Sequence, residues 1–518
     1  MIDNLTSGNL TTGKFRIRHP FIFALLFCVL LIVDRCYTLF QFGFVYTDID
    51  QTVLWNGVLN YSLGIFHEPF FYGQAYNYML EAFLAVPLFQ AGVPVYIALP
   101  IITSFLTLFP FLTLAGFLYH RKHYFYACLV LAFPPLLPVE YNFLTTLPRG
   151  FVQAMLFIPL LYPALFQPQN KRSINLLFLG SALCLIANTS SALFVLPILL
   201  YVYSFNITSL SFYLKSLIAI PVFALDYLAR QFYHNNPERI IHPSPTINLS
   251  RETFVESLKL LDHFEYLFPF MPESGIFFPF LFLILAIVSF KKSKSKAGWF
   301  NLLIITLLIF TLAIPKVQER HNAVSFFFTP SRLYLSLPLL FIISFFITFG
   351  KIKTSAWVLP ALVFITTLAV FIKNNDIKST IAKHMDGNYF PIAENQKLLA
   401  RAEQLNKVAD HHHVNLIVNA NISEYRYVFD SYAYNPVMRI NPQTDNGTIC
   451  VNLNGDRRTW LYSFSTPPER ILLNGFEIDV SQLQQFEHKM ININQILITQ
   501  NDLPMDMLFK QLGYKFGV

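Results

Sequence analysis

The chain has 518 residues and is 54% hydrophobic, but only 13% of its residues are charged, and its mean hydropathy is +0.47. A soluble globular protein would carry roughly 25% charged residues, so most of this chain must lie in lipid. The net charge of +7 comes from Lys and Arg in short clusters between apolar runs. That distribution is typical of membrane topology and argues against nucleic-acid binding.

About eleven apolar runs are candidate membrane-spanning helices, because a span needs about 20 apolar residues. The first run is longer than the core of a signal peptide and lacks a cleavage site of small residues, so we expect it to be retained as a helix. The eleven runs lie near residues 20–42, 94–118, 124–140, 150–166, 174–188, 190–206, 211–229, 276–290, 297–314, 333–349 and 355–372.

The basic clusters predict how these helices are oriented. With eleven spans, all of the clusters fall on one side of the membrane, which the positive-inside rule assigns to the cytoplasm. The N-terminus is then cytoplasmic, whereas three long connections (43–93, 230–275 and 315–332) and everything after about residue 374 lie outside. We expect the chemistry on that outer side. The clusters lie at residues 14–18, 121–122, 171–172, 215, 291–296 and 350–353.

The first outer connection contains two helical patterns. Residues 51–63 place apolar side chains largely on one helical face, as in a helix that lies in the membrane interface. Residues 75–90 form a second such segment; if they were a true span instead, the later basic clusters would fall outside. The apolar residues of the first pattern are Val53, Leu54, Trp55, Val58 and Leu59.

From about residue 374 the composition becomes that of a soluble domain. We expect a helix over 395–410, a buried strand over 414–420, further strands over 469–475 and 495–500, and a closing helix over 505–517. Such alternation indicates a small α/β domain of about 140 residues. The predicted fold is therefore mainly α, with a transmembrane domain over 1–373 and an extracytoplasmic α/β domain over 374–518.

Two carboxylates, Asp48 and Asp50, follow the first apolar run directly. Thr47 could cap the helix that comes next, with Asp50 completing a variant capping box. Acidic residues in a first turn also suit the helix dipole. Capping and catalysis do not exclude each other, so the rest of the connection decides between them.

Several features downstream of Asp50 occur together. Gly64 is followed by the stretch "FFYGQAY" from Phe70 to Tyr76 and by "LEAFLAVPLF", which begins at Leu80. This arrangement resembles the first external loop of bacterial membrane glycosyltransferases of the GT-C superfamily, which are related to protein mannosyltransferases and to lipid A aminoarabinose transferase. Residues 326–340, "FFFTPSRLYLSLPLL", resemble the Arg-Tyr-Leu-x-x-Pro stretch of such enzymes. Gln51 stands where the family usually has Glu.

The resemblance implies a GT-C-like enzyme of the bacterial inner (plasma) membrane. It would move a sugar from a polyprenyl-phosphate carrier to an extracytoplasmic glycan, lipid or protein acceptor, by an inverting single displacement. The departing phosphate needs cations rather than a general acid, whereas an acceptor hydroxyl needs a carboxylate base beside it. Asp50 falls where the family places its acid and is the predicted catalytic base. Asp48 is then a neighbouring charge at the substrate site.

Further residues are predicted to bind substrate. Glu81 lies within the matching Leu-Glu-Ala run and is expected to bind substrate or a divalent metal, although an acid on an interfacial helix could simply face water. Arginine suits phosphate because its planar fork binds two oxygens at once; each outer arginine could equally be an interfacial anchor. No cofactor is certain, and a divalent cation at Asp50 or Glu81 is possible. The other predicted substrate-binding residues are Gln74, Tyr76, Arg149, Arg320 and Arg332.

The main alternative is a membrane transporter, or a flippase or polymerase of lipid-linked glycans. A transporter would need ionisable groups within its spans, and Asp226 is the only clear acid that we identify late in a span. A scaffold protein is a third hypothesis and predicts no dependence on Asp50. His242, His263 and His321 lie in the outer connections without metal-ligand spacing, and residues 230–275, with Tyr266 and Phe268, are expected to form a flap over the prenyl chain.

Overall fold

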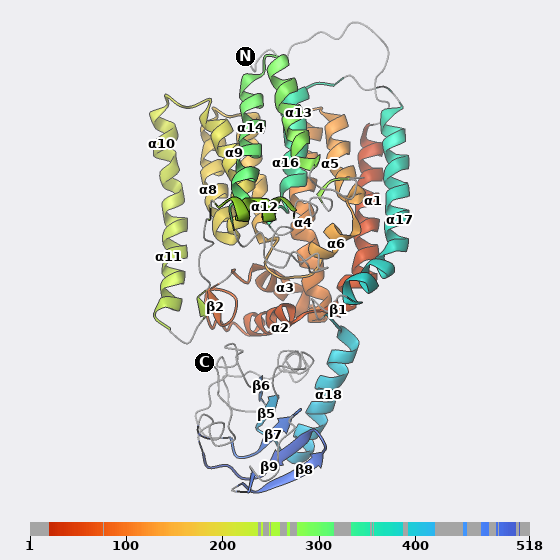
Figure 1. The fold of residues 1–518 in the computed structure, drawn as a ribbon, viewed down its shortest axis with the longest axis vertical. Coiled ribbons are helices and arrows are strands. Elements are labelled where there is room, and N and C mark those ends of the chain that lie inside the picture. Colours follow the sequence, from red (N-terminus) through yellow and green to blue (C-terminus); the bar gives the residue numbers. More distant parts are fainter. Residues whose placement is uncertain are drawn as a thin grey trace.

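The computed structural model describes residues 20–75, 77–236, 240–241, 248, 250–259, 267–269, 277–314, 333–352, 355, 357–386, 392–419, 449–452, 468–475, 483–484, 486–503 and 507. A bundle of helices makes up most of these residues, and a small sheet with one long helix lies beyond one end of the bundle (Figure 1). The predicted fold class, mainly α with a C-terminal α/β part, is confirmed.

Every predicted span coincides with helical structure, and most of these runs bury apolar side chains against one another in a single large core. The helix over Leu210–His234 is the exception among these spans, since only 6% of its apolar window is buried. Their elements are α1 (Pro20–Thr38) with the π-turn η2 (Leu39–Gly43), α4 (Val95–His120), α5 (Tyr124–Leu136), η3 (Gln153–Leu156) with η4 (Ile158–Leu161) and α7 (Tyr162–Phe166), α8 (Lys171–Ala187), η5 (Thr189–Ser191) with α9 (Ala192–Tyr203), α10 (Leu210–Ser216) with η6 (Leu217–Ala219) and α11 (Ile220–His234), α13 (Phe277–Lys291), α14 (Ser295–Thr311), α16 (Leu337–Phe349) and α17 (Val358–Asp386).

Among the described helices, four are long and apolar enough to cross a membrane, and they begin at Pro20, Val95, Leu210 and Val358. The other apolar helices have 10–17 residues, so eleven spans and their orientation stay predictions. The span expected over 150–166 is not one regular helix: it consists of two 3₁₀ turns and a short α-helix. Pro159 lies in the first turn of η4 and Pro163 in the first turn of α7, and proline lacks the N–H that a continuous helix needs.

The two helices of the first outer connection are α2 (Ile49–Ser62) and α3 (Leu80–Gln90), which lie across the end of the bundle that faces the sheet (Figure 1). Residues 51–60 are buried on all sides of α2, including the polar Gln51 and Asn56. The expectation of one apolar face in the membrane interface was therefore wrong for α2. This helix packs against α3, α4 and Leu398. Other parts of the protein therefore also cover the face of α2 that was not expected to be buried.

The C-terminal part contains α18 (Asn395–His412) and a five-stranded sheet in the order β6-β5-β7-β9-β8. The strands β6, β5 and β7 are parallel, β9 pairs antiparallel with β7, and β8 and β9 form an antiparallel hairpin. The predicted helix and strands are confirmed. The domain boundary expected at 373/374 falls inside α17. The predicted closing helix lies outside the described residues, except for residue 507. The strands are β5 (Leu416–Asn419), β6 (Ile449–Asn452), β7 (Ile471–Asn474), β8 (His488–Asn492) and β9 (Gln495–Ile498).

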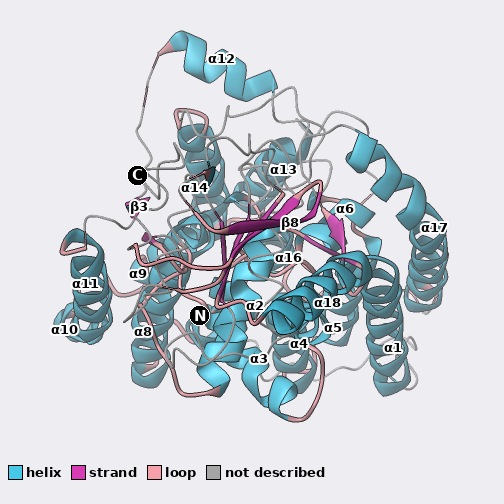
Figure 2. Cartoon of the chain, turned by 90° about the horizontal axis from the view of Figure 1, so that it is seen from below, coloured by secondary structure: helices cyan, strands magenta, loops and turns pink. Residues whose placement is uncertain are grey.

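Short backbone pairings join distant segments. The strand β1 (Tyr46–Thr47), just before Asp48, pairs antiparallel with β4 (Ala393–Glu394), which leads into α18. The strand β2 (Gln74–Ala75) pairs with β3 (Ile240–Ile241). The remaining helices are α6 (Val139–Leu144) and α12 (Arg251–Lys259). Figures 1 and 2 agree that α10 and α11 lie at one edge of the bundle, while α1 and α17 lie at the opposite edge.

Candidate active site

An arginine joins the two carboxylates that follow the first span. Arg149 Nε lies 2.9 Å from Asp48 Oδ2, and its Nη2 donates to Asp50 Oδ2 at 2.8 Å. Asp48 is 1% exposed and Arg149 6%, whereas the Asp50 side chain is 35% exposed. The structure thus brings Arg149, which was selected separately, to the pair of aspartates. Of the two carboxylates, the one at Asp50 is open to a reactant.

Asp48 has a second contact within the protein. Its Oδ1 accepts the backbone N–H of Gln51 at 3.0 Å, so Asp48 is the N-cap of α2. The expectation that Thr47 caps this helix was wrong, because the helix begins one residue later. Burial raises the pKa of Asp48 to about 6, against the opposing effect of the Arg149 charge. Both oxygens of Asp48 hold protein groups, which suits a supporting charge.

Glu81, in the first turn of α3, is fully buried, so the alternative that it simply faces water was wrong. Its Oε2 accepts the backbone N–H of Gly150 at 2.7 Å, and its Oε1 accepts from Thr103 Oγ1 at 3.2 Å. Gly150 has φ +77°, a backbone conformation that a residue with a side chain would adopt only with strain. Glu81 therefore fixes the backbone directly after Arg149.

The buried Glu81 predicts a pH-dependent stability. The residue lies on α3, outside the predicted spans, and burial raises its pKa from 4.5 to about 7. The folded protein then binds this proton more tightly than the unfolded chain. The free energy of unfolding should fall by on the order of 3 kcal/mol as the pH rises from below 4.5 to above 7. Thermal unfolding of Glu81→Gln should lack this fall.

The exposed Glu252 provides the control for that measurement. Between pH 5 and pH 8, wild type and Glu252→Gln should lose stability in parallel, and Glu81→Gln should lose less. Identical pH curves for all three proteins would contradict a buried, protonated Glu81.

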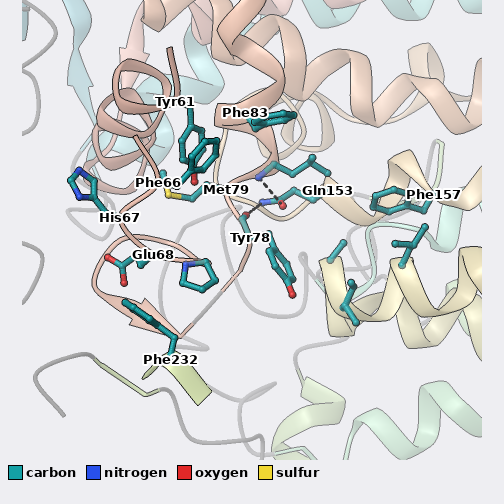
Figure 3. A pocket seen from close by; sticks show the side chains of 15 residues that line it. Tyr61, Phe66, His67, Glu68, Tyr78, Met79, Phe83, Gln153, Phe157 and Phe232 are labelled. Carbon is teal, nitrogen blue, oxygen red and sulfur yellow. Dashed lines mark hydrogen bonds between the residues drawn. The ribbon is translucent and has the colours of Figure 1, made fainter. Parts of the chain in front are cut away.

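A cavity of about 610 Å³ lies at the start of α3 (Figure 3). Leu80 and Gln153 line it; Leu80 directly precedes Glu81, and Gln153 follows Gly150 by three residues. Gln153 joins two sides of the cavity lining, since its Oε1 accepts from Leu80 N at 3.3 Å and its Nε2 donates to Tyr78 O. The other lining residues are mostly apolar: Tyr61, Phe66, His67, Glu68, Pro69, Tyr78, Met79, Phe83, Phe157, Leu183, Ile186, Ala187 and Phe232.

The helix α11 is held against this cavity by polar contacts. Asp226 accepts from Tyr78 Oη at 3.1 Å and pairs with Arg230 Nε at 2.8 Å. Tyr233 Oη accepts the backbone N–H of Phe70 at 2.9 Å. Asp226, which was considered as a transporter acid, is thus engaged in anchoring α11. It was also not the only acid late in a span, because Asp34 lies in α1.

Other predicted site residues lie elsewhere. Gln74 is half-buried in β2 and is not among the side chains that line the cavity. Phe268, expected over a prenyl chain, packs inside the bundle against Phe133 and Phe341. Within the described ranges, no group of three or more His, Cys, Asp or Glu residues could hold a metal ion. Tyr76, His242, His263, Tyr266, Arg320, His321 and Arg332 lie outside the described residues.

Some residues of the site escaped the sequence analysis. Glu68, Tyr78 and Gln153 line the cavity, but no spacing in the sequence connects them. Gln51 is buried, and its Nε2 has no hydrogen-bond partner among the described residues. The proline-glycine context of "LPRG" was the one local signal that the chain turns sharply at Arg149.

Comparisons with known proteins give one structural match. No family model matches the sequence, and no curated protein matches it. The chain is similar in structure to ArnT from Cupriavidus metallidurans, which was crystallised with bound undecaprenyl phosphate. The match has a TM-score of 0.48 and 11% sequence identity, and it covers 93% of this chain and 98% of that chain.

Proposed function

We propose that this protein is an integral-membrane glycosyltransferase that moves a sugar from a polyprenyl-phosphate carrier to an extracytoplasmic acceptor. The observation that carries the proposal is the contact between Asp50 and the buried Arg149, whose following residue Gly150 is bound by Glu81, at one end of a membrane-type bundle that also contains an apolar cavity. A half-exposed carboxylate held by a buried arginine suits a general base. The apolar cavity lined by Leu80 and Gln153 suits a lipid carrier.

The proposed reaction is a single displacement. The acceptor hydroxyl oxygen bonds to the anomeric carbon while the bond from that carbon to the phosphate oxygen breaks, so the configuration inverts. Polyprenyl phosphate leaves with the bonding electron pair, and Asp50 takes the proton of the hydroxyl. Arg149 orients Asp50 through the 2.8 Å contact. Arg149, Arg320 and Arg332 stay the predicted cations for the phosphate.

The cavity supports a lipid-linked donor. Its volume of about 610 Å³ lies in the range of about 300–1,000 Å³ that is usual for ligand sites. Aromatic and aliphatic side chains from α8, α11 and the connection before α3 line it, and they would receive the first isoprene units of the chain. Glu68 and His67 lie together at one end of this lining, and Phe157 lies toward the other (Figure 3).

The test uses purified protein, a panel of polyprenyl-phosphate sugars and the release of free polyprenyl phosphate. Leu183→Trp should raise the KM for a long-chain donor several-fold, because the indole would occupy part of the cavity. Leu185→Trp is the matched control, since Leu185 lies on the same helix but not on the cavity. No release from any donor would contradict glycosyl transfer. An unchanged KM in Leu183→Trp would contradict the use of this cavity.

One observation favours the transporter or flippase alternative. Asp34 and Arg35 of α1 and Lys373 of α17 are charged residues within apolar helices, as transport pathways require. Movement of lipid-linked sugar across the bilayer of proteoliposomes, without release of polyprenyl phosphate, would support that alternative.

A further inference from the structure

A buried cluster of charged and polar side chains lies between α1, α6 and α17, outside the site described above. Lys373 Nζ lies 2.8 Å from Asp34 Oδ1, and Asn142 Nδ2 donates to Asp34 Oδ2 at 3.0 Å. Asp34 and Arg35 are each only 4% exposed. Burying these charges has a large desolvation cost, and apolar side chains would join the helices equally well. Stability alone therefore does not explain the cluster.

Arg35 is the member of the cluster that reaches toward the site. Its Nη1 donates to Thr145 Oγ1 at 3.0 Å and to Thr146 Oγ1 at 2.8 Å, beyond the end of α6. The carbonyl of Thr145 accepts from Thr107 Oγ1 of α4 at 3.2 Å. These contacts fix the backbone three residues before Arg149. Pro148 lies between and restricts the chain further.

The segment that leads to Asp48 and Asp50 packs on the same part of the chain, near Thr146. The chain runs from α1 through η2 and β1 to Asp48 and Asp50. In η2, Phe42 stacks on Phe143 with ring centroids 4.1 Å apart, and a Cβ on Gly43 would lie 2.5 Å from Thr146 Cγ2. The segment before the aspartates and the segment before the arginine thus pack on each other directly beside Arg35.

We propose that Asp34, Arg35 and Lys373 form a positioning cluster that sets where Arg149 meets Asp48 and Asp50. This inference rests on the proposed function, because it gives the cluster a purpose in orienting the base and the cation of the transfer site. Arg35 acts through the turn at 142–146, and Lys373 holds Asp34, which in turn holds Asn142 of that turn. None of the three touches the reactants.

The test replaces Arg35 by Gln. A misplacement of about 1 Å can cost 100-fold in rate, so kcat should fall roughly 10- to 100-fold. The KM for the donor should change much less, because the apolar cavity is untouched. In a protein that already carries Arg149→Ala, Arg35→Gln should cause no further loss, since it acts through Arg149. Multiplying losses in the double variant would overturn the proposal.

A second readout does not depend on activity. Hydrogen–deuterium exchange over residues 143–150 should increase in Arg35→Gln. Asn301→Leu is the matched control: Asn301 is a fully buried amide that bonds Thr348 in another part of the bundle, and its loss should not raise exchange over 143–150. If Arg35→Gln does not fold, Thr146→Val removes one acceptor of Arg35 with nearly unchanged shape and should show a smaller effect in the same direction.

The two readouts separate the two proposals. Faster exchange over 143–150, in a protein that releases polyprenyl phosphate from no donor, supports the positioning cluster and contradicts the proposed function. Unchanged exchange over 143–150, in a protein that is an active transferase, overturns the positioning cluster and leaves the proposed function in place.

Discussion

Replacing Arg149 by Ala is expected to lower the free energy of unfolding by about 3–5 kcal/mol, the usual cost of removing one partner of a buried ion pair. The loss follows from Asp48, which is 1% exposed and would be left beside Asp50 without a cation. The measurement is thermal unfolding of the purified protein in detergent. The loss should shrink as the pH falls, because a protonated Asp48 needs no cation.

The chain contains a matched control for this prediction. Arg230 also pairs with an aspartate, Asp226, but its side chain is 41% exposed. Solvent-exposed ion pairs contribute about 0–1 kcal/mol, so Arg230→Ala should change the unfolding temperature little. Equal losses in Arg149→Ala and Arg230→Ala would show that burial of the Asp48 pair does not determine its strength.

The parts of the fold that could be predicted are those set by local pattern. The apolar runs predicted the helices, and most of these bury their side chains against one another. Short runs such as "LIVN" at 416–419 marked the strands of the C-terminal part. The irregular stretch over 150–166 was missed since its mean hydropathy resembles that of a span. The two prolines that interrupt it, Pro159 and Pro163, were visible in the sequence.

The site was predicted residue by residue but not as an arrangement. The aspartate pair, Glu81 and Arg149 were selected for separate reasons, and the contacts of Arg149 with Asp50 and of Gly150 with Glu81 join segments about 70 to 100 residues apart. Such pairings depend on how α3 and the turn after α6 pack, which no local pattern contains. The positioning cluster was missed for the same reason: Asp34 and Lys373 are separated by almost the whole bundle in the sequence.

The C-terminal part contacts the site through the backbone. Asn395 donates from its N–H to Val45 O at 2.8 Å and from Nδ2 to Phe44 O at 3.0 Å, directly before β1 and Asp48. Leu398 of α18 is buried in the same cluster as Trp55 of α2. These contacts explain why α2 is covered on both faces. They make the C-terminal part a support for the carboxylate segment.

The largest effect on catalysis is expected from Asp50→Asn. If Asp50 accepts the proton of the acceptor hydroxyl, its loss should lower kcat about 100- to 10,000-fold, which is the usual contribution of a general base. Stability should change little, because Asp50 is 35% exposed and Asp48 keeps its contact with Arg149. The measurement is the rate of polyprenyl phosphate release at saturating donor.

Asp48→Asn, the same substitution two residues earlier, separates a base from a supporting charge. The Asn side chain keeps an oxygen that can cap α2, so the helix that carries Asp50 should stay in place. Turnover should therefore fall far less than in Asp50→Asn, while the ion pair of Arg149 is weakened. Equal losses of kcat in the two variants would mean that the carboxylates act as one charge, and that proton transfer to Asp50 does not limit the reaction.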